Sequence, residues 1–158
     1  MANVMRHRTG AKNPILADVA SATVVEIGDL ICITSNLATT PSQLGSSAGS
    51  LGDTAQTFAG VAMAASAAGE TTPVRVATTG VFEYPCDTGS VYIGYFAKIN
   101  ASALDQKVAR QTSLSSLCIG YIMPNNTGGV GIGAGSQTSC LVAIHANVFG
   151  PTLDNTGD

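Results

Sequence analysis

The chain has 158 residues, a formal net charge of −3 and only 11% charged residues, against about 25% in an average domain. This length predicts one domain with a proper hydrophobic core, and the shortage of charge predicts that part of the surface is covered by further copies or by a partner. Because the net charge is negative and every apolar stretch is too short to span a bilayer, we expect neither nucleic acid nor a membrane as a partner.

Residues 1–20 differ in composition from the rest of the chain, and Asn13-Pro14 predicts a turn within them. The segment holds a basic cluster that consists of Arg6, His7, Arg8 and Lys12. Two interpretations stay open: a frayed terminus, which is common in domains, or an extended arm that lies on an acidic neighbouring surface. We therefore treat the four basic side chains as candidate contacts to another subunit or a partner, and expect the arm to be dispensable for folding.

Strand signals fill the first half of the remaining chain. Residues 21–26 and 28–33 are rich in β-branched side chains, which predicts two strands. Residues 36–56 have the Ser, Thr and Gly content of a long loop. A further strand is predicted at residues 58–63, followed by a bend at Ala68-Gly69-Glu70, where glycine reaches positive φ without steric penalty.

Residues 74–77 alternate in the manner of a half-buried strand, with the two valines on one face and Arg75 on the other. A second bend is predicted at Thr79-Gly80, before the chain continues into Val81.

The second half repeats the alternation of strands and polar loops. Within residues 100–116, Ser102 to Asp105 fits the start of a short helix, and residues 107–109 fit a short strand at a hairpin tip; both remain open. The glycine-rich residues 125–139 contain GxGxG, but no G-K-[ST] follows, so a hairpin connection is favoured over a phosphate loop. Residues 141–148 form the last predicted strand.

These elements suggest an internal duplication. Three pairs of segments match in the same order: 59–63 with 119–123, 28–33 with 89–94, and 73–77 with 140–144. We therefore predict one β domain at residues 21–150, built from halves at about 21–84 and 85–150, and followed by a polar tail at 151–158.

No group of residues predicts an active site. The lone strand histidine His145 fits a hydrogen-bonding or interface role better than catalysis, and Glu83 and Asp87, which bracket Pro85, fit an exposed turn better than an acid–base pair. No C-x-x-C pair is present, so the cysteines are predicted to be reduced, buried side chains: Cys32, Cys86, Cys118 and Cys140. We expect a protein that is not an enzyme and that binds no metal and no cofactor.

Several short motifs follow one another along the chain. They are Glu26-Ile27-Gly28-Asp29-Leu30-Ile31, Phe58-Ala59-Gly60-Val61-Ala62, Ala68-Gly69-Glu70, Val74-Arg75-Val76, Thr79-Gly80-Val81-Phe82 and Ile119-Gly120. In this order and spacing, over roughly residues 19–148, the chain resembles the capsid cement (decoration) proteins of tailed bacteriophages. It departs from that pattern at Gly89-Ser90, where Gly-Asp is expected, and at residues 125–139, which lack an AGE-like bend.

The resemblance implies an all-β fold, a small barrel or tulip-like sheet assembly with long loops. It also implies a homotrimer, made in the host cytoplasm, that sits on the outside of the virion, binds the major capsid protein and stabilises the coat. The basic N-terminal segment has no counterpart in the pattern of the family, so its four basic residues are candidate capsid or subunit contacts on the strength of their charge alone.

Two other functions stay open. One is a glycan- or receptor-binding accessory protein of the head or tail, in which residues 36–56 and 125–139 would form the binding loops. Neither loop contains an aromatic side chain, although sugar sites usually need one for stacking, so this function is the alternative. The other is an unfamiliar hydrolase, which the scattered carboxylates make improbable.

Overall fold

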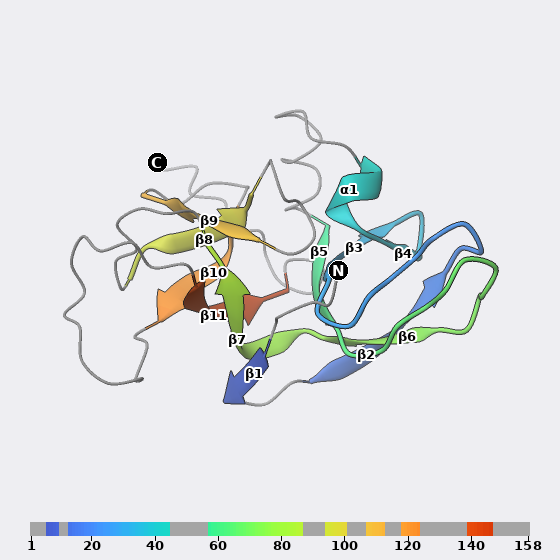
Figure 1. Ribbon diagram of the computed structural model, residues 1–158, viewed down its shortest axis with the longest axis horizontal. Helices are drawn as coiled ribbons and strands as arrows, with labels where there is room; N and C mark the ends of the chain where they lie inside the picture. Colours follow the sequence, from blue (N-terminus) through green and yellow to red (C-terminus); the bar gives the residue numbers. More distant parts are fainter. Residues whose placement is uncertain are drawn as a thin grey trace, which may run out of the picture.

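The part of the chain that the structure describes is built mainly from β-strands, which form two sheets. The computed structural model describes residues 6–9, 13–44, 57–86, 94–100, 107–112, 118–123 and 139–146, and for residues 6–9 only the backbone. In this part of the chain a single four-residue helix, α1 (Pro41–Leu44), accompanies the strands. Figure 1 shows the two sheets side by side, with the barrel on the right. The all-β fold with a small barrel is therefore confirmed.

The first sheet is a closed barrel. Its strands follow one another in the order β2 (Pro14–Val19), β4 (Leu37–Thr39), β3 (Leu30–Thr34), β5 (Phe58–Ala62) and β6 (Val74–Ala77). Neighbours are antiparallel except β2 and β4, whose parallel pairing closes the barrel together with the antiparallel pair β2–β6.

The second sheet has six strands. Their order is β1 (Arg6–Thr9), β7 (Thr79–Pro85), β11 (Ser139–His145), β10 (Cys118–Met123), β8 (Phe96–Ile99) and β9 (Val108–Gln111). All of these neighbours are antiparallel. Cys86, directly after β7, makes a parallel bridge with Val108 of β9. Because β7 is the second strand of the sheet and β9 is the last, this bridge requires the sheet to curve so that the two strands approach each other.

The barrel has its own hydrophobic core of small and β-branched side chains. The buried members are Ala17, Val19, Val25, Ile31, Ala38, Ala59, Ala62, Val74 and Val76. The predicted alternation of β6 is confirmed, because both valines are buried and Arg75 is exposed.

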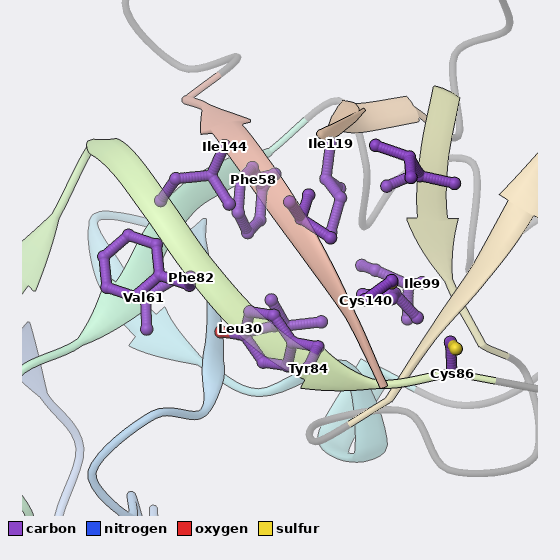
Figure 2. Packing of buried hydrophobic residues seen from close by; sticks show 14 of the residues in the cluster. Leu30, Phe58, Val61, Phe82, Tyr84, Cys86, Ile99, Ile119, Cys140 and Ile144 are labelled. Carbon is purple, nitrogen blue, oxygen red and sulfur yellow. The ribbon is translucent and has the colours of Figure 1, made fainter. Parts of the chain in front are cut away.

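A second core fills the space between the sheets (Figure 2). The barrel contributes outward-facing side chains such as Leu30, Phe58 and Val61, and the second sheet contributes Phe82 and Tyr84. Strand β5 is therefore covered on both faces, which explains why all five of its residues are buried. The hydroxyl of Tyr84 also donates a hydrogen bond of 3.0 Å to the carbonyl oxygen of Gly28, which ties the second sheet to the barrel.

The two sheets repeat the same register. Val61 lies opposite Ala77 between β5 and β6, and Tyr121 lies opposite Ala143 between β10 and β11. Both β5 and β10 carry a bulge immediately before their glycine. Strand β2 pairs with β6 as β7 pairs with β11. This correspondence supports the predicted duplication and makes β10 the counterpart of β5.

The turn at the start of each repeat shows that one of the three sequence matches, 28–33 with 89–94, is out of register. The amide of Gly28 donates to the carbonyl of Ala62, and the amide of Gly94 donates to the carbonyl of Ile122. Both glycines have positive φ, at 96° and 82°. Gly94 is thus the counterpart of Gly28, whereas the sequence match had used Gly89, which lies outside the described residues.

The expectation that residues 1–20 form an arm outside the domain is wrong. Strand β1 pairs with β7 and strand β2 closes the barrel. Ala17 and Val19 point into the barrel core, so their burial overrides the loop-like composition of the segment.

Two further predictions of local structure are corrected. Residues 21–26 are no strand, because a turn occupies Ser21-Ala22 and only Val25 forms an isolated bridge, with Ser66. Thr79-Gly80 is no bend, because both residues belong to β7. The chain passes from the barrel to the second sheet at Thr78, so the change of sheet falls before the expected boundary at residue 84.

The loops are described in part. Residues 36–56 contain strand β4 and helix α1 before residue 45, where the described part stops. The strand predicted at residues 107–109 is confirmed as β9. The alternative helix at 102–105, the glycine-rich residues 125–138 and the tail at 151–158 lie outside the described residues.

Candidate functional site: an aromatic face on the second sheet

The predicted basic contact residues lie on an outer strand of the second sheet. Arg6, His7 and Arg8 are in β1, where the backbone of Arg6 is opposite Glu83. Lys12 lies outside the described residues. The structure thus places three of the four candidates on one strand, beside β7.

The carboxylates serve local structure where they are described. Glu83 is in β7 and not in a turn, and its Oε1 accepts a hydrogen bond of 3.0 Å from the hydroxyl of Ser139. Its proposed partner Asp87 lies outside the described residues. Buried Asp29 accepts a hydrogen bond of 2.7 Å from the amide of Glu26. Among the described residues, no three His, Cys, Asp or Glu side chains gather closely enough to hold a metal ion.

The buried phenol of Tyr84 is held in its neutral form. Burial raises the pKa of Tyr84 well above its usual value, and the negative charge of Asp29 raises it further. A neutral phenol is the form that donates to the carbonyl of Gly28. Tyr84 therefore acts as a link between sheets.

The four cysteines are free and buried. The pKa of Cys140 is raised by its hydrogen bond with Cys86, by burial, and by the nearby charges of Cys86 and Glu83. A thiol in that state is a poor nucleophile and a poor metal ligand. His145, exposed at the end of β11, pairs with Thr79.

One group of exposed apolar side chains lies on the outer side of β8 and β10 and forms an aromatic face. We define the aromatic face as Phe96, Tyr121 and Met123. Phe96 and Tyr121 are directly opposite each other in the ladder, with ring centroids 5.1 Å apart and ring planes inclined by 42°. Tyr121 is 41% exposed and Met123 38% exposed. Next to this pair in sequence, the ring of Tyr95 lies 5.4 Å from the guanidinium carbon of Arg110, a cation–π distance.

Sequence reasoning did not find this face. The available signal was the alternation in β10, where Tyr121 and Met123 flank the buried Ile122. Alternation alone does not reveal which of the two faces a neighbouring sheet covers, because that depends on tertiary packing.

Comparisons of the chain with family models, with curated proteins and with solved structures found no match. In the described part of the chain, no helix has the length and apolar character needed to cross a membrane.

Proposed function

We propose that this chain is a structural virion protein, a capsid cement protein of a tailed bacteriophage. It binds the outside of the assembled head as an oligomer and stabilises the coat lattice. The observation that carries the proposal is the agreement between the motifs of the resemblance and the elements that build the barrel.

The Gly-Asp-Leu motif forms the tight turn that starts β3. The amide of Glu26 donates to the carboxylate of Asp29 at 2.7 Å, which closes the turn. Gly28 and Asp29 exchange backbone hydrogen bonds of 2.9 Å each with Ala62 at the end of β5. The first two motifs of the resemblance are therefore joined in space as parts of one structural unit.

The Ala-Gly-Glu motif forms a second turn of the same kind. Gly69 has φ of 93°, and its amide donates to the carbonyl of Ser21 at 2.7 Å. The carboxylate of Glu70 accepts a hydrogen bond of 2.9 Å from the amide of Ala67. This turn anchors the segment that follows β2, and β6 begins at Val74, close behind it. Motifs with these roles are expected of a shared fold, which supports the resemblance.

The surface is suited to association. Only 11% of the residues are charged, and the aromatic face leaves large apolar side chains exposed. Three linked subunits that engage three neighbouring coat subunits make the later contacts intramolecular, so avidity can exceed a single contact by roughly 10²–10⁴. A ligand that binds the intact lattice and not its dissociated subunits stabilises the lattice by about 2.7 kcal/mol at a hundredfold excess over its Kd.

The test compares the disruption temperature of heads with and without the protein, followed by release of DNA. Decorated heads are expected to disrupt at a higher temperature, and adding the purified protein back to stripped heads is expected to restore it. Equal disruption temperatures would refute the cement function and leave the receptor-binding alternative.

A further inference from the structure

We propose that Cys86 and Cys140 are an oxidation site, at which a disulfide bond forms when the native protein meets a small-molecule disulfide. The bond fixes the seam of the second sheet, which we define as the parallel bridge between Cys86 and Val108. The inference goes beyond the proposed function, because it concerns a covalent modification that does not depend on what the chain binds.

The two cysteines lie on the same side of neighbouring strands. Cys140 of β11 is opposite Tyr84 of β7, and Cys86 follows two residues after Tyr84. Because side chains alternate along a strand, Tyr84 and Cys86 share a side. All three residues belong to one buried cluster (Figure 2). A hydrogen bond joins the two thiols, so they are in contact and enclosed by apolar side chains.

The first barrel shows the importance of this position. Strand β7 pairs with β11 as β2 pairs with β6, which makes Cys86 the counterpart of Val19 and Cys140 the counterpart of Val74. Val19 makes a parallel pair with Ala38, and this pairing closes the barrel. The seam of the second sheet therefore lies at the equivalent point. Among the described residues it consists of an isolated bridge, with two thiols where the barrel has two core valines.

The backbone permits the bond after a small movement. Diagonal neighbours in an antiparallel pair are about 7–8 Å apart at Cα, whereas disulfides usually span about 4.4–6.8 Å. Cys86 comes directly after Pro85, whose pair with Ser139 is the last of this ladder in the described residues. The end of β7 can therefore move toward β11 while the ladder stays intact. A bond formed under such strain is easily reduced, so we expect a dithiol to reverse it.

The oxidant is a small disulfide such as oxidised glutathione, and the reaction has two steps. Cys86 loses its proton, and its thiolate attacks one glutathione sulfur, which gives a mixed disulfide and releases one glutathione thiolate. Cys140 then loses its proton and attacks the sulfur of Cys86, which forms the protein disulfide and releases the second glutathione thiolate. Two electrons pass from the protein to the oxidant, and the two released protons convert both glutathione thiolates to thiols.

Burial makes this reaction slow. Both thiols are buried, and the pKa of Cys140 is raised by its hydrogen bond with Cys86 and by burial. The thiolates therefore form when the end of β7 opens, and we expect oxidation to take on the order of hours. Cys86 reacts first, because it lies at the end of its strand and the pKa of Cys140 is raised.

The bond encloses much of the second half of the chain. Strands β8, β9 and β10 all lie between Cys86 and Cys140 in sequence. Closing so long a segment restricts the unfolded chain, and we expect the unfolding temperature to rise by about 5 °C after part of the gain is offset by strain. Under the proposed function, the chain passes from the reducing host cytoplasm to an oxidising medium, where the bond would form.

The experiment exposes the purified, reduced full-length chain to millimolar oxidised glutathione under native conditions. The intact mass is expected to fall by that of two hydrogen atoms, and digestion without reduction should give one cross-linked pair of peptides, which contain Cys86 and Cys140. Cys140→Ala is expected to abolish the cross-link. Cys118→Ala, at another buried cysteine, is the matched control and should retain it.

Thermal unfolding followed by circular dichroism tests the effect on the seam. The oxidised chain is expected to unfold at the higher temperature, and dithiothreitol should remove the increase. Cys140→Ala should show no increase at all. A cross-linked chain with an unchanged unfolding temperature would contradict the stabilisation of the seam.

Three results would overturn the oxidation site itself. They are a chain that is oxidised only in denaturant, a cross-link that involves Cys32 or Cys118, and a cross-link between two copies. Circular dichroism shows whether each variant is folded, and peptide mapping of the unmodified chain decides the matter if Cys140→Ala is not. None of these results depends on the disruption temperature of heads, so this inference and the proposed function are tested separately.

Discussion

Gly60 and Gly120 occupy the same position in the two sheets, and neither leaves room for a side chain. A Cβ atom at Gly60 would lie 2.0 Å from the carbonyl oxygen of Ala77, and one at Gly120 would lie 2.1 Å from the carbonyl oxygen of Ala143. In both sheets the obstacle is the backbone of the neighbouring strand, which cannot rotate away. Glycine at these two positions is therefore required by the close approach of strands.

The first prediction is that Gly120→Ala destabilises the protein by about 3 kcal/mol or more, because the strands must separate to relieve the overlap. Gly60→Ala is expected to cost at least as much, since Gly60 also has φ of 140°. The measurement is the free energy of unfolding in denaturant.

Gly69→Ala is the control for these variants, because nothing lies within 4 Å of a Cβ placed there. Its positive φ alone predicts a cost of about 1–2 kcal/mol. If Gly120→Ala were no worse than Gly69→Ala, the steric explanation would be wrong.

The elements that were predicted well have short-range signals. Strand β6 follows from alternation, and the bend at Gly69 follows from the ability of glycine to adopt positive φ. The turn at Gly28 was not predicted, because residues 28–33 were assigned to a strand that begins only at Leu30. The sequence also showed the match of Gly60 with Gly120, since both stand in x-Gly-x-x-Met segments.

The failures concern long-range pairing. Strand β2 was assigned to an N-terminal arm because its partner β6 lies about 60 residues away in sequence. No local sequence pattern indicates that the two strands pair. Residues 21–26 have strand-like composition but lack a partner beyond the single bridge at Val25. The aromatic face was missed because exposure of Tyr121 is a property of packing between sheets.

The second prediction concerns Tyr84. Tyr84→Phe removes the hydrogen bond to the carbonyl of Gly28 and is expected to lower the free energy of unfolding by about 1–2 kcal/mol at neutral pH. Tyr121→Phe is the control, because Tyr121 is 41% exposed, and it should change the free energy of unfolding by less than about 0.5 kcal/mol. A neutral result for Tyr84→Phe would contradict the linking role.

The same residue predicts a pH dependence. The pKa of Tyr84 is raised in the folded state, so above pH of about 10 the unfolded chain loses a proton that the folded chain retains. The contribution of Tyr84 to stability is thus complete below that pH and falls by about 1.4 kcal/mol per pH unit above it. Tyr84→Phe should remove this part of the alkaline slope in unfolding experiments at pH 9 to 11.

The third prediction concerns thiol reactivity. Because all four cysteines are buried and the pKa of Cys140 is raised, the native protein should react with a thiol reagent far more slowly than the denatured chain. Raising the pH from 7 to 9 should not make Cys140 reactive. Identification of the labelled peptide would show which thiol reacts first, and rapid labelling of Cys140 would contradict its burial beside Cys86.

The last prediction tests the role of the N-terminal strands. Deleting residues 1–19 removes β2, whose Ala17 and Val19 lie in the barrel core, and the barrel then cannot close between β4 and β6. We expect this variant to lose cooperative thermal unfolding. Among the described elements, deleting residues 1–12 removes β1 and exposes an edge of β7, which should leave the barrel folded but promote aggregation through the free edge. Circular dichroism during heating, with light scattering in parallel, distinguishes the two. If the chain without residues 1–19 unfolded like the full-length protein, the segment would be a dispensable arm after all, and the closure of the barrel by β2 would have to be abandoned.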